Sequence, residues 1–198
     1  MKTTVWMVAA AASLLLAACD RTTGVDRTGR GGPAQLVYAP AGTELKLLNS
    51  SNGTPSETEI IVASPSGMRG AYTTKAGKAG GFFPGCWGCG GDAQIEIEKY
   101  AALWPLETGK NVAFVRTTPD GVKARVVIRV SGTQKVETPA GSFDTYILDG
   151  RLEHITGPRY SAQVRAWWAQ DPGWVVKAEG GDSQGSTLSS EVASVKLP

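Results

Sequence analysis

The chain has 198 residues, with 20 Lys or Arg, 18 Asp or Glu and one His, which gives a formal net charge of +2. A balance this close to neutral gives no electrostatic reason to expect nucleic acid as a partner. The length suits a single domain that can bury a sizeable core.

Residues 1–18 have the three parts of a removable export signal. Lys2 gives a positive start, residues 5–16 form an apolar run, and Leu16-Ala17-Ala18 lead into Cys19. The run has 12 residues, whereas a membrane-spanning helix needs roughly 20. No cluster of charges follows it, as expected for a signal that is cleaved.

This segment resembles the signal peptide and lipobox of bacterial lipoproteins. In that family the cysteine thiol is coupled to diacylglycerol, the chain is cut just before it, and the new amine is acylated. The resemblance implies a covalent lipid on Cys19, which anchors the protein to a membrane of the bacterial envelope, facing the periplasm. Asp20 stands where some Gram-negative lipoproteins carry an inner-membrane retention signal, and the choice of membrane stays open.

Residues 19–33 are predicted to be an acylated N-terminus and a flexible tether. This stretch is rich in glycine, and Val25 is its only aliphatic side chain. Such a composition cannot form a core. We therefore expect the folded, β-rich periplasmic domain to span residues 34–198.

The first half of this domain contains short extended segments separated by turn signals. Asn52-Gly53, Pro65-Ser66-Gly67 and Asp120-Gly121 are predicted turns. Strands are expected over residues 35–38, 43–48, 57–63, 68–74, 93–99 and 111–117. Residues 100–104 could form one helical turn before Pro105.

The second half shows clearer alternation. Lys123 to Val130 places β-branched and small residues on one face and arginines on the other, which is typical of a half-buried strand. Residues 143–155 and 160–168 follow the same pattern, and Pro139-Ala140-Gly141 predicts a hairpin turn between the first two runs. A further strand begins at Trp174. Gly180 to Gly185 is expected to be a turn, followed by a last strand over residues 186–197.

These segments predict an all-β fold with few or no helices after the signal peptide. A single antiparallel sheet curled into a barrel or half-barrel is expected, with a β-sandwich as the alternative. Closure or strong curling would also remove exposed sheet edges, which invite aggregation.

Several motifs resemble a family of exported bacterial β-proteins of unknown function that share a Pro-Ala-Gly-x-Phe hairpin. The match runs roughly from Tyr38 to Lys177, and the resemblance implies fold and compartment only. The motifs are Trp104-Pro105-Leu106, Gly109-Lys110, residues 136–146 around Pro139-Ala140-Gly141-Ser142-Phe143, Trp167-Trp168 and residues 173–177.

Residues 77–91 form a glycine-rich segment, with seven glycines in fifteen positions, which carries Cys86 and Cys89. If Cys19 is acylated, the other two cysteines remain as an even pair in an oxidising compartment, which favours a small structural disulfide. Thiol–disulfide exchange is an alternative, although no helical pattern follows the motif as in thioredoxin-like sites. Metal binding is the third: two thiolates could hold Cu(I), with Met68 as a further ligand, whereas zinc lacks ligands because His154 is the only histidine.

Phe82, Phe83 and Trp87 lie on the same segment. If exposed, they would form an apolar patch for a ligand or partner. The favoured interpretation is that they fold back over an open end of the barrel.

Three other patterns are interpreted as structural. Gly181-Asp182-Ser183-Gln184-Gly185 matches the Gly-x-Ser-x-Gly pattern of hydrolases, but no helix follows and a polar hairpin turn is favoured. Glu96 and Glu98 would share one face of a strand, at a spacing possible for a glycosidase pair, and are expected to be simply exposed. His154 is expected at a surface or edge.

The sequence therefore predicts a non-enzymatic envelope lipoprotein without a metal or a cofactor other than its covalent lipid. It would bind an apolar ligand in the curled sheet or an envelope protein at the glycine-rich loop. The alternative is a thiol–disulfide or metal-handling protein acting through Cys86 and Cys89.

Overall fold

The computed structural model describes residues 33–86, 88–90 and 93–198. Within them, eleven strands form one antiparallel sheet in the order β4-β3-β2-β1-β11-β10-β9-β8-β7-β6-β5. The expectation of an all-β fold with a single curled sheet is confirmed. The elements are β1 (Glu44–Ser51), β2 (Thr54–Ser66), β3 (Arg69–Thr74), β4 (Ala79–Phe82), β5 (Gln94–Ile95), α1 (Ile97–Ala101), β6 (Asn111–Thr117), β7 (Lys123–Thr138), β8 (Gly141–His154), β9 (Ser161–Ala169), β10 (Trp174–Asp182) and β11 (Thr187–Lys196).

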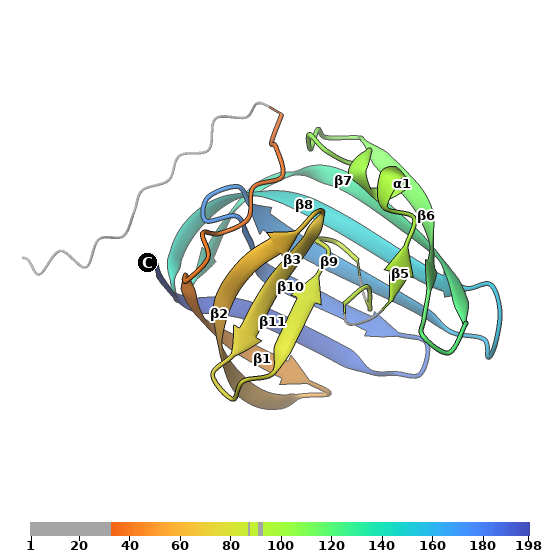
Figure 1. The fold of residues 1–198 in the computed structure, drawn as a ribbon, viewed down its shortest axis with the longest axis horizontal. Coiled ribbons are helices and arrows are strands. Elements are labelled where there is room, and N and C mark those ends of the chain that lie inside the picture. The colour runs from red at the N-terminus through yellow and green to blue at the C-terminus, as the bar shows by residue number, and fades with distance from the viewer. Residues whose placement is uncertain (1–32, 87, 91–92) are drawn as a thin grey trace, which may run out of the picture.

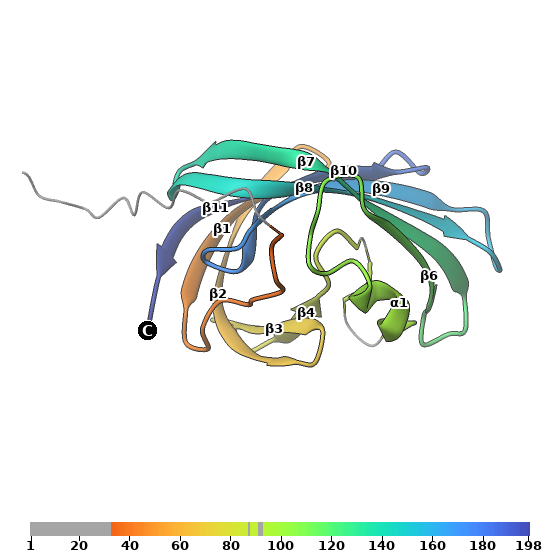
Figure 2. The same ribbon diagram turned by 90° about the horizontal axis from the view of Figure 1, so that it is seen from above.

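The sheet is open and strongly curled (Figures 1 and 2). In Figure 2 it forms an arch: β7 to β11 make the roof, β2 to β4 curl under one side, and β6 with α1 under the other. The segment that follows β4 turns back under the arch, as does the chain leading into β1. The arch therefore has a concave face that is partly filled by its own loops.

The long central strands alternate as predicted. On β7, Ala124, Val126, Ile128 and Val130 are at most 1% exposed, while Arg125 and Arg129 face solvent. The β7–β8 hairpin turns at Pro139-Ala140 and continues at Gly141, as the Pro-Ala-Gly motif predicts. The apolar faces of these strands form the roof of the core.

The core has two clusters on the concave side. One gathers around the fully buried Trp168, Tyr100 and Phe114. The other gathers around Trp174, Ile60 and Val192, where the sheet curls. Residues of both clusters also line the cavity that is described in the next subsection.

Two strand predictions are wrong. Residues 35–38 do not pair with the sheet; Ala34 makes one isolated bridge to Leu106, and the chain then crosses the concave side, where the Tyr38 hydroxyl donates to the Met68 carbonyl at 2.7 Å. In the segment 93–99, only Gln94 and Ile95 form a strand, and the helix α1 begins at Ile97. Apart from the two residues of β5, which pair with β6, these segments cover the core instead of extending the sheet.

Candidate functional site

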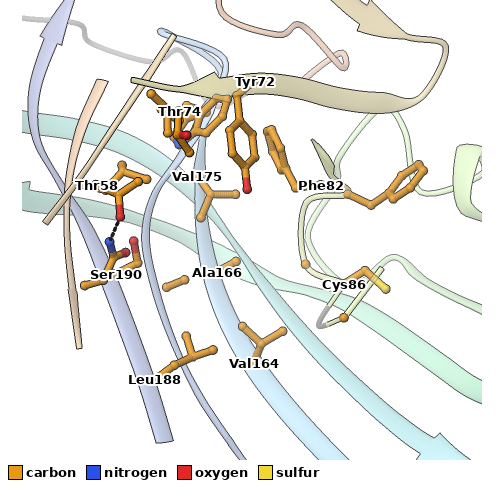
Figure 3. Close-up of a pocket in the computed structure, with 18 of the residues that line it drawn as sticks. Thr58, Tyr72, Thr74, Phe82, Cys86, Val164, Ala166, Val175, Leu188 and Ser190 are labelled. Carbon is orange, nitrogen blue, oxygen red and sulfur yellow. Dashed lines mark hydrogen bonds between the residues drawn. The ribbon is translucent and has the colours of Figure 1, made fainter. Parts of the chain in front are cut away.

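The concave face contains an open cavity of about 740 Å³. Its walls are supplied by β1, β2 and β3 on one side, by β9, β10 and β11 along the roof, and by the segment that follows β4 (Figure 3). A volume of this size lies within the range of ordinary small-molecule pockets. Curling of the sheet is what creates it, because a flat sheet would present these side chains to solvent.

One part of the cavity wall is aromatic and aliphatic. The rings of Phe82 and Trp174 lie 4.4 Å apart, centroid to centroid, and Trp174 is only 5% exposed. In Figure 3, Val164 and Leu188 line the opposite part of the wall, with Val175 between them and the aromatic rings. These side chains offer an apolar ligand a surface that excludes water.

A second part of the wall carries uncharged polar side chains. Strand register places Ser56, Asn49 and Ser190 directly opposite one another across β2, β1 and β11. Thr58 is two residues from Ser56 on the same face, and the Asn49 amide donates to its hydroxyl at 3.1 Å. Figure 3 shows Thr58 and Ser190 together on one side of the cavity. We call Asn49, Ser56, Thr58 and Ser190 the hydroxyl–amide cluster.

None of the described residues that line the cavity is a Lys, Arg, Asp, Glu or His. The strands that form it do carry charges, but on their other face: Glu57 and Glu59 of β2 alternate with Ser56, Thr58 and Ile60 and are exposed. The cavity therefore has a polar wall with no side chain to balance an ionised ligand.

The glycine-rich segment forms the inner wall. Phe83 is 7% exposed and stacks edge-on against Tyr100 with centroids 5.2 Å apart, and Phe82 is partly buried. Of the three aromatic residues suggested as a ligand or partner loop, these two therefore lie under the arch and do not form an exposed patch. Trp87, the third, lies outside the described residues.

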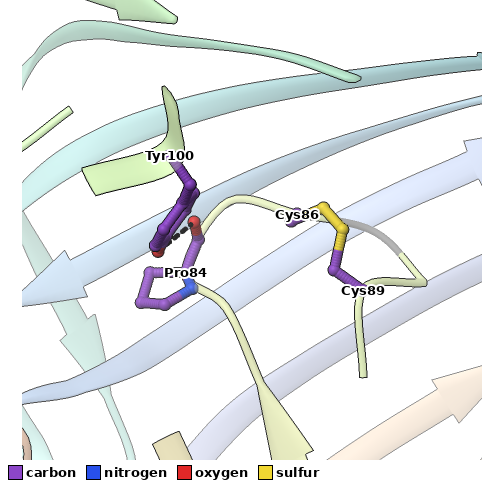
Figure 4. The surroundings of a disulfide bond; sticks show 4 residues. All are labelled: Pro84, Cys86, Cys89 and Tyr100. Atoms are coloured by element: carbon purple, nitrogen blue, oxygen red, sulfur yellow. Dashed lines mark hydrogen bonds between the residues drawn. A yellow bond between two sulfur atoms is a disulfide. The ribbon is translucent and has the colours of Figure 1, made fainter. Parts of the chain in front are cut away.

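The sulfur atoms of Cys86 and Cys89 are at disulfide distance, with Cα atoms 5.5 Å apart (Figure 4). Cys89 has no exposed surface, and Cys86 lines the cavity. Beside them the Tyr100 hydroxyl donates to the Pro84 carbonyl at 3.3 Å, and burial raises the pKa of that phenol. That the pair is a structural disulfide stays a prediction. Cys19, the proposed lipidation site, lies outside the described residues.

The remaining sequence candidates are not brought together as a site. Ser183 lies in the turn between β10 and β11, where its hydroxyl accepts from the Ser161 N–H at 3.0 Å, so the Gly-x-Ser-x-Gly match is a hairpin turn. His154 ends β8 and its Nδ1 lies 3.0 Å from the Pro158 carbonyl oxygen. Glu96 precedes α1 and Glu98 lies on it, so their predicted placement on one strand face is wrong.

A second hollow, of about 800 Å³, crosses the outer face of β8, β9 and β10. Its charges are already paired: the Arg165 guanidinium donates to Asp149 at 2.7 Å, and both side chains are partly exposed. Mutually satisfied charges on a solvated face are common and point to no ligand.

Among the described residues, no group of three or more His, Cys, Asp or Glu side chains is placed to hold a metal ion. The same residues include no helix with the length and apolar character needed to cross a membrane.

No protein-family model matches the chain, and no curated protein is found similar to it. Solved structures with a similar fold include the hypothetical lipoprotein YmcC from Escherichia coli, with 8% identity, a TM-score of 0.49, and coverage of 80% of this chain and 86% of that one. A "putative exported protein with YmcC-like fold" from Bacteroides fragilis has 14% identity and a TM-score of 0.48, covering 82% and 99%. A "putative lipoprotein" from Parabacteroides distasonis has 12% identity and a TM-score of 0.48, covering 83% and 100%. By description these neighbours are lipoproteins or exported proteins, and the likeness assigns this chain no function.

The hydroxyl–amide cluster was not among the residues singled out from the sequence. A signal for it exists: along β1, β2 and β11 the inward positions change from Leu45, Ile60 and Val192 to Asn49, Ser56 and Ser190. Alternation alone assigns such residues to a face. It does not show that three distant segments bring them side by side.

Proposed function

We propose that this protein is a lipid-anchored envelope lipoprotein that faces the periplasm and binds an apolar ligand in the concave cavity, without catalysing a reaction. The observation that carries the proposal is the cavity of about 740 Å³, with an aromatic and aliphatic wall and no ionisable lining residue among those described. Pockets of this size with mainly apolar walls are the usual form of small-molecule sites.

The anchor is the second part of the proposal. It rests on the sequence of residues 1–19, with Leu16-Ala17-Ala18 before Cys19. Metabolic labelling with a clickable fatty acid should label the wild-type protein, and Cys19→Ala should lose the label and leave the membrane fraction. Equal labelling of the variant would remove the lipoprotein assignment.

Ligand binding is tested by native mass spectrometry of the mature domain purified from cells. We expect a co-purifying lipid, displaced in Ala178→Trp, because Ala178 lines the cavity and an indole would fill it. Glu179→Trp is the matched control, since Glu179 is the next residue of β10, on the opposite face, and is exposed. An empty wild-type domain that also fails to bind added lipids would contradict the proposal.

A thiol–disulfide role has less support. Cys89 is fully buried, so a partner thiolate could reach only the half-buried Cys86 without local opening of the loop. If the role were redox, mild reductant should open the pair and Cys86→Ser should abolish function. A disulfide that resists mild reductant would count against it.

A further inference from the structure

The arrangement of polar and apolar walls gives information on the chemical class of the ligand. We infer that the cavity binds an uncharged amphiphile, such as an acylglycerol, whose hydrocarbon chain packs on the aromatic and aliphatic wall while its hydroxyl or ester oxygens bond to the hydroxyl–amide cluster. This inference rests on the proposed function and deepens it. It depends on three features of the site.

The first feature is the continuity of the cluster. Ser56, Asn49 and Ser190 are adjacent because β2, β1 and β11 pair in register, and directly opposed side chains in a sheet have Cβ atoms about 5 Å apart. Thr58 is fixed to this row by its bond from the Asn49 amide. The cluster is therefore a patch of several donors and acceptors that one polar head group can span.

The second feature is that the cluster retains hydrogen-bonding capacity. Asn49 uses one N–H toward Thr58, which leaves its carbonyl oxygen and second N–H for other partners. Among the hydrogen bonds of the described residues, none involves the hydroxyl of Ser56 or Ser190. An oxygen-rich ligand would supply partners of both kinds, whereas a pure hydrocarbon would desolvate these groups without replacing their bonds to water.

The third feature is the absence of charge among the lining residues described. An ionised carboxylate or ammonium that enters the cavity loses part of its hydration and finds no opposite charge among the lining residues described. Burying an unpaired charge is far more costly than burying a hydrogen-bonded neutral group. The lining thus selects against fatty acids and amines whose hydrocarbon chains would fit equally well.

The apolar wall lies beside the hydroxyl–amide cluster and has room for the hydrocarbon chain of a ligand. Ala178 of β10 is the direct neighbour of Ser190, and Gly180 is the direct neighbour of Leu188. Small residues at these positions leave open space on the roof between Leu188, Val164 and the rings of Phe82 and Trp174. A hydrocarbon chain can lie along this space while its head group stays at the cluster.

The test compares ligands with one chain length and different head groups. Mono-dodecanoyl glycerol, dodecanoate, dodecylamine and dodecane are titrated into the mature domain at pH 7.5, below micelle-forming concentrations, by displacement of a fluorescent apolar probe. We expect the glycerol ester to bind at least about tenfold more tightly than either ion, which corresponds to about 1.4 kcal/mol. Dodecanoate or dodecylamine binding as tightly as the ester would overturn the inference and leave the proposed function standing.

Variants then locate the head group. Thr58→Val with Ser190→Ala should weaken the ester about threefold to tenfold and leave dodecane equally or more tightly bound, because the variant removes hydrogen bonds to the ester and polar groups that a hydrocarbon desolvates. Ser189→Ala is the control, since Ser189 is exposed on the other face of β11. An unchanged ester affinity in a folded double variant would contradict the placement. If no ligand displaces the probe and the probe itself does not bind, the proposed function fails as well.

Discussion

Single side chains on the concave face decide what the cavity can accept. The inward positions of β1 and β2 begin as Leu45 and Ile60, both 2% exposed, and end as Asn49 and Ser56 toward the open rim. An apolar interior that grades into uncharged polar groups fits an amphiphile better than a fully apolar or an ionic molecule. Alternation in the sequence predicts that these residues share a face. The cluster, however, exists only because β11 pairs with β1, although β11 starts at Thr187, 143 positions after β1 starts at Glu44.

Tyr100 of α1 holds the glycine-rich segment in place through contacts with Phe83 and Pro84. Its ring packs against Phe83 and Phe114, and its hydroxyl donates to the Pro84 carbonyl at 3.3 Å. Tyr100→Phe should lower the free energy of unfolding by about 0.5–1.5 kcal/mol, because the packing remains and one buried hydrogen bond is lost. Urea denaturation followed by tryptophan fluorescence measures this. Tyr72→Phe is the control, since the Tyr72 hydroxyl faces the cavity (Figure 3), and a larger loss in this control would contradict the prediction.

The Glu96 carboxylate connects the start of α1 to β6 through hydrogen bonds, and the strength of this connection depends on pH. A bond from Lys99 and a second from the Val115 N–H, at 2.9 and 2.7 Å, hold the pKa of this carboxyl below its usual range. A carboxyl whose pKa is lower in the folded state stabilises the fold above its unfolded pKa, and that contribution is lost as the pH falls through the folded pKa. Stability should therefore fall in acid, below about pH 4.

The test for this linkage is Glu96→Gln. The variant should lose less stability than the wild type between pH 7 and pH 3, as measured by urea denaturation at each pH. Glu98→Gln, an exposed position on the same helix, should follow the wild-type profile. Identical pH profiles for Glu96→Gln and the wild type would show that the two bonds do not contribute.

At the scale of elements, the glycine-rich segment is seated on the sheet through backbone contact. A Cβ at Gly150 of β8 would lie 2.0 Å from the Gly85 carbonyl oxygen and 3.0 Å from Val164. Gly150→Ala should therefore push the segment off the roof and cost about 1–3 kcal/mol of unfolding free energy. It should also weaken probe binding, because Gly85 and Val164 line the cavity. Arg151→Ala, the next residue on the exposed face, should change stability by no more than about 0.5 kcal/mol.

The Cys86–Cys89 pair closes a very short loop, with a sequence separation of 3. The chain-entropy model gives about 2 kcal/mol for a loop of this size, so loss of the bond should leave the fold intact. Cys86→Ser with Cys89→Ser should keep the strand-type circular dichroism spectrum, with a lower Tm and faster proteolysis near residue 88. Global unfolding of the double variant would contradict a local role.

The long hairpins were the most predictable elements, and the short coverings the least. The strands β7, β8 and β9 carry enough alternating β-branched and aromatic residues to define both face and turn. By contrast, β4 contains Gly80 and Gly81, and glycine disfavours a strand. Glycine is needed at these positions because a Cβ at Gly80 would clash with the Tyr72 ring, and one at Gly81 would clash with the Arg69 side chain. The sequence alone predicts a strand where α1 begins, because Ile95 and Ile97 alternate with glutamates. Such segments owe their structure to the surface that they cover.

At the scale of the whole molecule, the curled sheet leaves its two edges short. The edge strands β4 and β5 have four and two residues, and short edges limit pairing with other chains. The sequence predicted the curling in general terms from strand number and turn spacing. It could not predict where the first and last strands meet, because that pairing is non-local.

The last strand joins the two halves of the sheet. β1 to β4 form one meander and β5 to β10 another, and β11 pairs with β1 on one side and with β10 on the other. β11 also supplies Val192, which is fully buried, and Ser190 and Leu188 of the cavity wall. The sheet is therefore incomplete until the end of the chain is available.

Deletion of residues 187–198 tests this dependence. The truncated domain should lose cooperative thermal unfolding and probe binding, because β1 and β10 become unpaired edges in the middle of the sheet and the core around Val192 opens. Deletion of Leu197 and Pro198 alone is the control, since both lie beyond β11. A truncated domain that still melts in one sharp transition, followed by circular dichroism, would mean that the two meanders associate without their connecting strand.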